Sequence, residues 1–307
     1  MSSVSANGRL APAAPDAITK DVAAYFVLAI SITWLFWIPV ALARNGALPF
    51  SLPGGPMEVL GAAGPLISAV ILTARREGGR GVRRLFGRLL EVRFKWYWWL
   101  VAAAVPFVFH YTPVVIADAA GVIEAGYADF GAPFPMALVM LLPWLILLSL
   151  EEVGWRGFAL PRMQEKYSAI KAGLLLGVGW GLWQAPFALG RAFAEGTGSP
   201  AVRLLAVFVF WVVMSLLWTW VFNNTRGSLI MANFFYVFLN ASWDWLDVPG
   251  EVAWIFEFAL PPVVAVVIIA LVAWRFGASS FTADGKKVTW SSLQARGAAG
   301  RRTGAAG

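Results

Sequence analysis

The chain has 307 residues, of which 59% are hydrophobic and 13% charged, with a formal net charge of +7 and no cysteine. A soluble domain is nearer half apolar and a quarter charged, so this composition excludes a soluble globular protein and indicates an integral membrane protein. The lack of cysteine excludes disulfides and thiolate metal sites. We expect no nucleic-acid partner, because the basic residues of a membrane protein more often mark its cytoplasmic loops.

The sequence predicts one all-α transmembrane domain over residues 21–276. Residues 1–20 are small and polar and lack the apolar core of a signal peptide, so they predict a disordered cytoplasmic N-terminus. Residues 277–307 predict a cytoplasmic C-terminal tail. Between them lie about eight apolar stretches near the length of roughly 20 residues that a helix needs to cross a bilayer. In chain order these are 22–43, 57–73, 96–116, 136–150 and onward, 169–189, 204–222, 229–245 and 252–274.

Basic residues between the second and third stretches set the expected orientation. They are Arg75, Arg76, Arg80, Arg83, Arg84, Arg88, Arg93 and Lys95. Short cytoplasmic loops are enriched in Lys and Arg, so we expect a multi-pass inner (plasma) membrane protein with both termini in the cytoplasm. The segment also fits a basic amphipathic helix on the inner leaflet, so anionic lipid is an expected partner of residues 75–95. A solvated basic loop is the alternative.

Charged residues follow the fourth apolar stretch, in the segment SLEEVGWRGFALPRMQ, residues 149–164. Glu152 and Arg156 are four residues apart, share a helix face and therefore predict an ion pair. Glu151 points about 100° away without a cation of its own, which favours a general base or acid. The alternative is that both glutamates lie at the membrane interface and serve no chemistry.

Further polar residues interrupt the later apolar stretches. Gln184 stands beside Pro186, and Tyr236, Asn240 and Asp244 are spaced so that they nearly share one helix face. Gln184 can equally form an interhelical hydrogen bond, and Tyr236 can be a packing residue. His110 is the chain's one histidine, and we expect it to be a hydrogen-bonded packing residue, with a ligand role at the site as the alternative.

Three motifs in order resemble the CAAX protease and bacteriocin-processing family of intramembrane metalloproteases, which includes the type II CAAX prenyl endopeptidase. The resemblance covers roughly residues 135–245. Glu151, Glu152 and Arg156 match the family's Glu-Glu-x-x-x-Arg motif. Residues 180–186 match a Trp-x-x-Trp-His-x-Pro-like stretch. Tyr236 and Asn240 match His-x-x-x-Asn, and Gly227-Ser228 precedes them as in the family. Gln184 and Tyr236 stand where the family has its two histidines.

The resemblance implies that a glutamate and two histidines activate water, with or through a metal, while the asparagine stabilises an oxyanion. Because both histidines are replaced here, we expect no cofactor, with zinc only if the family chemistry survives. The expected site is a buried cluster of Glu151, Glu152, Arg156, Gln184, Tyr236 and Asn240, open toward the cytoplasmic leaflet.

Three functions remain open at this point. The first is an endopeptidase that acts on a peptide or membrane-protein substrate. The second is a catalytically degenerate relative that binds such a partner without cleaving it. The third is an ion or solute transporter that uses the intramembrane glutamates.

Overall fold

The computed structural model describes residues 15–127 and 151–296, and these are almost entirely helical. The helices are α1 (Pro15–Arg44), α2 (Gly54–Ala62), α3 (Gly64–Gly87), a 3₁₀ turn (Arg88–Leu90), α4 (Tyr97–Ala119), a π-helical turn (Trp155–Ala159), α6 (Leu160–Lys166), α7 (Ala169–Glu195), α8 (Pro200–Asn224), α9 (Leu229–Asp244), a second π-helical turn (Ile255–Ala259) and α10 (Pro261–Phe276). Two short strands, β1 (Gly126–Tyr127) and β2 (Leu246–Asp247), pair antiparallel, with Gly126 opposite Asp247.

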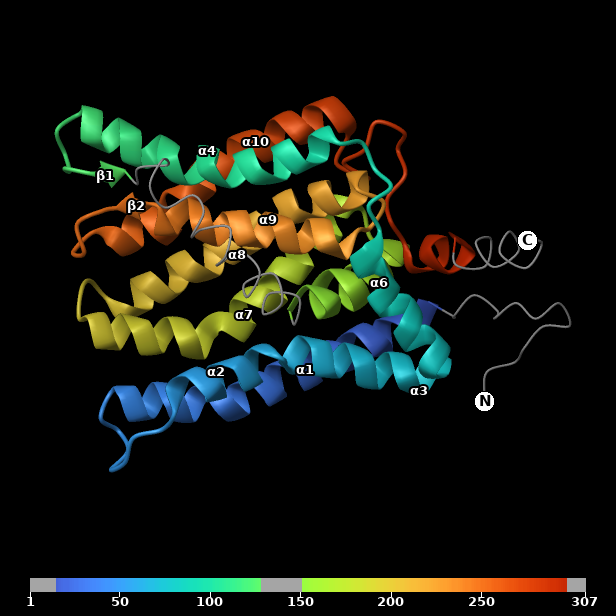
Figure 1. The fold of residues 1–307 in the computed structure, drawn as a ribbon, viewed down its shortest axis with the longest axis horizontal. Coiled ribbons are helices and arrows are strands. Elements are labelled where there is room, and N and C mark those ends of the chain that lie inside the picture. The colour runs from blue at the N-terminus through green and yellow to red at the C-terminus, as the bar shows by residue number, and fades with distance from the viewer. Residues whose placement is uncertain (1–14, 128–150, 297–307) are drawn as a thin grey trace, which may run out of the picture.

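The helices form an elongated bundle in which α7 and α8 are the central pair (Figure 1). Helices α1 and α3 pack together, and α1 also packs on α7. On the other side, α9 packs on α4, and α10 packs on both α4 and α8. The two chain ends leave the bundle at the same end, opposite the β1–β2 pair and the turn between α7 and α8 (Figure 1).

Six helical segments of the described residues are long and apolar enough to cross a membrane. They correspond to the first, second, third, fifth, sixth and eighth of the predicted stretches. The seventh forms α9, which has only 16 residues and is shorter than a full crossing requires. The fourth, 136–150, lies outside the described residues. The prediction of an all-α, multi-pass membrane protein is confirmed.

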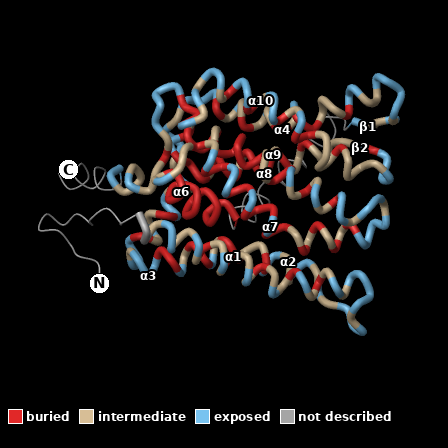
Figure 2. Tube along the Cα trace, turned by 180° about the vertical axis from the view of Figure 1, so that it is seen from behind, coloured by how far each residue is buried: buried red, intermediate tan, exposed pale blue. Residues whose placement is uncertain are grey.

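Burial follows the pattern expected of a bundle in lipid. The buried residues gather along the centre, and the exposed ones lie on the outer helix faces and at the ends (Figure 2). Large apolar side chains on the outer faces are well exposed, among them Leu35 at 69%, Leu100 at 60% and Val267 at 58%. Such a surface would be costly in water, whereas lipid tails solvate it.

Both predicted end segments differ from expectation. Helix α1 begins at Pro15, inside the stretch 1–20 that was predicted to be disordered, and residues 1–14 are not described. The described part of the tail is folded onto the bundle, because Phe281 and Val288 are buried. The side chain of Gln164 donates to the Val288 carbonyl over 2.9 Å. Residues 277–296 are therefore part of the folded unit.

Helix α3 is kinked at Gly78, whose φ of 62° is accessible to glycine at little cost. After the kink the helix is amphipathic: Gly81 and Leu85 are buried while Arg80 and Arg83 are exposed. This arrangement matches the basic amphipathic helix predicted for this segment.

Candidate active site

The segment that follows Glu151 and Glu152 departs from regular helix. Residues 151–154 form an α-helical turn, Trp155–Ala159 form a π-helical turn, and α6 follows. A π-helical turn widens the helix by one residue and is frequent at functional sites. In this segment, where the helical period changes, the carbonyls of Arg156 and Gly157 accept hydrogen bonds from a side chain outside the segment.

That donor is Arg88, which follows α3. Its guanidinium donates to the carbonyl of Gly157 over 2.8 Å, to that of Arg156 over 3.2 Å and to that of Gly227 over 2.7 and 3.0 Å. Arg88 thus connects the π-helical turn to the residue before Ser228, the N-cap of α9. In the sequence Arg88 is distinguishable only as one basic residue among several, because no local pattern reveals a partner this far along the chain.

Glu152 and Arg156 form the predicted ion pair. Arg156 Nη1 lies 2.9 Å from Glu152 Oε1, and both side chains are completely buried. The Arg156 guanidinium carbon also lies 4.1 Å from the ring centre of Trp180 and 4.4 Å from that of Trp218. Contact with aromatic faces stabilises a desolvated guanidinium, so the two tryptophans compensate part of the cost of burying Arg156.

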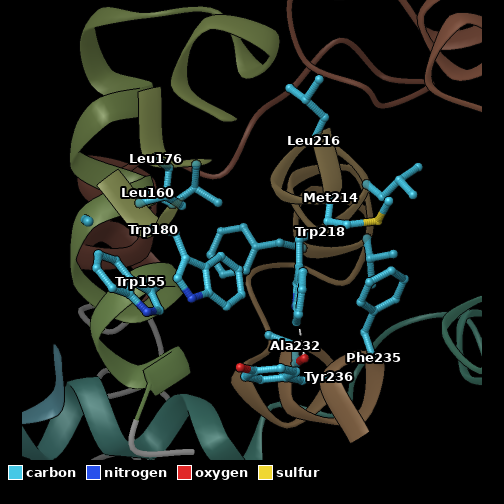
Figure 3. Packing of buried hydrophobic residues seen from close by; sticks show 14 of the residues in the cluster. Trp155, Leu160, Leu176, Trp180, Met214, Leu216, Trp218, Ala232, Phe235 and Tyr236 are labelled. Atoms are coloured by element: carbon cyan, nitrogen blue, oxygen red, sulfur yellow. Dashed lines mark hydrogen bonds between the residues drawn. The ribbon is translucent and has the colours of Figure 1, made fainter. Parts of the chain in front are cut away.

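These tryptophans are contributed by the central helices. The side chains of Trp155, Trp180, Trp218 and Tyr236 gather in one buried cluster, and the indole of Trp218 donates to the Ala232 carbonyl over 3.0 Å (Figure 3). Trp180 precedes Gln184 by one helical turn, so the spacing alone could have indicated a shared face. Trp180 and Trp218 are therefore site residues in addition to the six that were predicted.

Glu151 points to a different helix from its neighbour. The phenol of Tyr236 donates to Glu151 Oε2 over 3.0 Å, and Glu151 is 6% exposed. The ring of Tyr236 packs edge-on against Trp180 and Trp218, with ring centres 5.7 and 5.1 Å apart. Tyr236 therefore acts as a fixed hydrogen-bond donor that orients the Glu151 carboxylate.

A cavity of about 590 Å³ brings the predicted residues together. Glu151, Gln184, Tyr236 and Asn240 all line it, and Asp244 completes the predicted face of α9. Glu152 and Arg156 do not line the cavity, because they lie buried behind it. The six residues therefore divide into four that face the cavity and a pair that supports the wall.

The two amides at the cavity differ in how they are held. Asn240 Nδ2 donates to the carbonyl of Tyr236 over 2.9 Å, which fixes its side chain on α9. Gln184 on α7 is 8% exposed and lies on the cavity wall. Both residues line the cavity, and each amide has more donors and acceptors than its printed hydrogen bonds use.

His110 also lines this cavity. Its Nδ1 lies 2.7 Å from the Ser242 hydroxyl, the residue is 2% exposed, and its ring stacks on Phe210. The expectation of a hydrogen-bonded packing residue is confirmed. His110 is held by α9 at the wall of the cavity, and the structure gives it no carboxylate partner among the described residues.

The cavity reaches the end of the bundle that lies away from the chain termini. Its lining includes Gly55 and Glu58 at the start of α2, Arg191 in the last turns of α7 and Asp244 at the end of α9. The predicted opening toward the cytoplasmic leaflet and the predicted cytoplasmic termini are therefore incompatible. The end of the bundle at which the cavity opens depends on how far along each helix the lining residues lie, and composition does not fix this.

The donor set at the cavity does not suit zinc. Among the described residues, no three His, Cys, Asp or Glu side chains gather in a way that could hold a metal ion. Around Glu151 the cavity offers a phenol and two amides, whereas zinc favours thiolate, imidazole and carboxylate ligands. The metal chemistry that the resemblance implies therefore finds no fitting set of ligands in residues 15–127 and 151–296.

Comparison with known proteins agrees with the motifs. Residues 132–242 match the family described as type II CAAX prenyl endopeptidase Rce1-like. The chain is also 26% identical over 262 residues to CAAX prenyl protease 2 of Methanococcus maripaludis, a match that covers 80% of this chain and 92% of the relative. These findings confirm the predicted resemblance: the chain is similar to the Rce1-like type II CAAX prenyl endopeptidases.

Proposed function

We propose that the protein is an intramembrane endopeptidase that cleaves a peptide segment inside the cavity, with Glu151 as general base. The observation that carries the proposal is the Glu151 carboxylate, oriented by Tyr236 on the wall of a cavity that it shares with two amides. Glu151 takes a proton from water as the water oxygen adds to the scissile carbonyl. The N–H groups of Gln184 and Asn240 donate to the oxyanion that forms. Glu151 then returns the proton to the leaving amine as the C–N bond breaks.

The second candidate is a degenerate relative that binds a peptide without cleaving it. Its support is the replacement of both motif histidines by Gln184 and Tyr236, neither of which is a base at neutral pH. The cavity has the same arrangement in both proposals, so only a measurement of peptide cleavage distinguishes the endopeptidase from the degenerate relative.

A transporter has less support. Transport needs a polar path to both faces of the membrane. Behind Glu151 the described core is closed by Trp155, Trp180 and Trp218, which are fully buried. The pocket at the other end of the bundle, lined by Arg84, Arg226 and neighbouring residues, shares no lining residue with the cavity.

Glu151→Gln tests the proposal, because the amide keeps the size of the side chain and removes its basicity. We expect cleavage of a library of apolar fluorogenic peptides to fall by about 10²-fold or more, the range typical of a lost general base. The matched control is Glu58→Gln, which changes a carboxylate at the far rim of the same cavity. Equal rates for wild type and Glu151→Gln contradict the role of Glu151. Saturable peptide binding without any cleavage favours the degenerate relative.

We also propose that the protein works without zinc. Protein purified without chelator is expected to contain no stoichiometric zinc by elemental analysis, because no three ligand-type side chains among the described residues gather closely enough to hold a metal ion. The double variant Gln184→His, Tyr236→His is expected to gain zinc and, with it, activity. Stoichiometric zinc in the wild type that disappears in Glu151→Gln would overturn the proposal.

Anionic lipid at residues 75–95 stays a prediction. A pocket of about 200 Å³ at this end supports it, since its wall combines Arg84, Arg88, Arg226 and Arg296 with the apolar side chains of Trp290 and Leu293. Such a pocket can take a phosphate headgroup and the start of its acyl chains. The measurement is retention of phosphatidylglycerol by the purified protein through detergent washing, and its loss in Arg226→Ala.

A further inference from the structure

The connections of the bundle differ sharply in charge between its two ends. At the cavity end, the connections 45–53, 120–127, 196–199 and 245–254 contain no Lys or Arg. At the end where the termini leave, the connections 88–96, 225–228 and 277–296 carry seven: Arg88, Arg93, Lys95, Arg226, Lys286, Lys287 and Arg296. The excess of Lys and Arg in short loops is the feature that sets the orientation of a membrane protein.

The described arginines near the cavity end do not weaken this asymmetry. Each belongs to an ion pair within the bundle: Arg44 with Glu58, Arg191 with Glu257 and Arg203 with Glu195. By contrast, Arg80 and Arg83 are exposed on the amphipathic part of α3 at the opposite end. An exposed basic face suits the anionic inner leaflet.

The cavity opens at the end without basic connections. Gly55 at the start of α2 and Asp244 at the end of α9 line it and are exposed, and both helix ends lie opposite the two chain termini (Figure 1). Glu151 and Tyr236 line the cavity, and the fully buried Trp180 and Trp218 pack against the ring of Tyr236. The mouth and the basic end therefore face opposite sides of the membrane.

From these observations we infer that the cavity opens to the extracytoplasmic face and receives its peptide from that side. This inference rests on the proposed function only in taking a peptide as the occupant. The occupant is then a segment of an exported or membrane-inserted protein. The wall of the cavity suits an apolar segment, since it includes Phe187, Phe210, Trp211 and Trp243. Asp244, whose carboxylate has no hydrogen-bond or ion-pair partner among the described residues, favours a basic group at the mouth.

The natural absence of cysteine makes a direct test possible. Gly55, Gly250 and Gly87 are exposed, and a Cβ added at any of them meets no atom within 4 Å. We would introduce Gly55→Cys at the mouth, Gly250→Cys at the same end outside the cavity, and Gly87→Cys at the basic end. Each variant is treated with a membrane-impermeant maleimide in intact spheroplasts and again after permeabilisation.

We expect intact spheroplasts to label Gly55→Cys and Gly250→Cys but not Gly87→Cys, and permeabilised ones to label all three. Labelling of Gly87→Cys in intact spheroplasts, alone or together with the others, overturns the inference. This readout needs no cleavage, so it stands apart from the Glu151→Gln experiment and fails separately from it.

Access to the cavity is tested with the same variants. A bulky maleimide applied from outside is expected to lower peptide binding at least about 10-fold in Gly55→Cys and to leave Gly250→Cys unchanged. Unchanged binding in fully labelled Gly55→Cys shows that the peptide enters elsewhere and overturns the assignment of the mouth.

Discussion

Glu152→Ala is expected to lower the free energy of unfolding by about 3–5 kcal/mol, the cost of breaking a buried ion pair from one side. Arg156 is completely buried, and Glu152 is its one ion-pair partner among the described residues. Two of its guanidinium nitrogens, Nε and Nη2, already have no hydrogen-bond partner in the part of the chain that the structure describes. Removing Glu152 leaves Trp180 and Trp218 as the remaining stabilisation of a buried cation, and ring faces do not replace a carboxylate.

Glu151→Ala is the matched comparison, since it removes the neighbouring carboxylate. We expect it to cost less than about 1 kcal/mol, because Glu151 faces the cavity and forms no ion pair with an arginine or lysine of the described residues. The measurement is the thermal unfolding of both variants in detergent by tryptophan fluorescence, with the abundance of each in membranes. The Glu152→Ala midpoint should lie on the order of 10 °C below wild type. Equal midpoints for the two variants would contradict the structural role of the pair.

A double variant separates the pair from general damage to the core. Glu152→Leu with Arg156→Met removes both charges and keeps the apolar volume. Replacement of a buried pair by apolar residues is often neutral or stabilising. The double variant should therefore be more stable than Glu152→Ala, although it has two substitutions.

The parts of this site that the sequence could predict are those set by local spacing. Glu152 and Arg156 are one helical turn apart and form a pair, and Tyr236, Asn240 and Asp244 line one cavity because they share a face of α9. These relations hold within one helix and depend only on its period.

The relations that could not be predicted join distant segments or depend on depth in the membrane. Nothing near Arg88 in the sequence indicates that it reaches the carbonyls of Gly157 and Gly227. The side of the membrane to which the cavity opens depends on how far along their helices Glu151 and Gln184 lie. Hydropathy does not give these positions. The C-terminal segment was also predicted as a tail because packing through Phe281 and Val288 leaves little mark on composition.

Arg88→Ala is expected to lower both stability and activity, although Arg88 does not line the cavity. Its guanidinium donates four hydrogen bonds to the carbonyls of Arg156, Gly157 and Gly227. A hydrogen bond from a charged donor contributes about 1.5–3 kcal/mol and such values are not additive, so we expect a total loss of about 3–5 kcal/mol. Thermal unfolding in detergent measures this loss, with Arg83→Ala as control because that arginine is exposed and forms no hydrogen bond or ion pair with the described residues.

The effect on activity distinguishes a positioning residue from a general stabiliser. Glu151 lies within one turn of the π-helical segment that Arg88 holds, so relaxation of that segment moves the carboxylate away from Tyr236. A displacement of about 1 Å can cost on the order of 10²-fold in rate. We therefore expect kcat to fall well below the wild-type value at a temperature where Arg88→Ala is still folded, while KM changes little. Arg88→Lys, whose ammonium can reach fewer of the three carbonyls, should fall between Arg88→Ala and wild type in both stability and kcat. A folded Arg88→Ala variant with the kcat of the wild type would show that the π-helical turn positions Glu151 without Arg88.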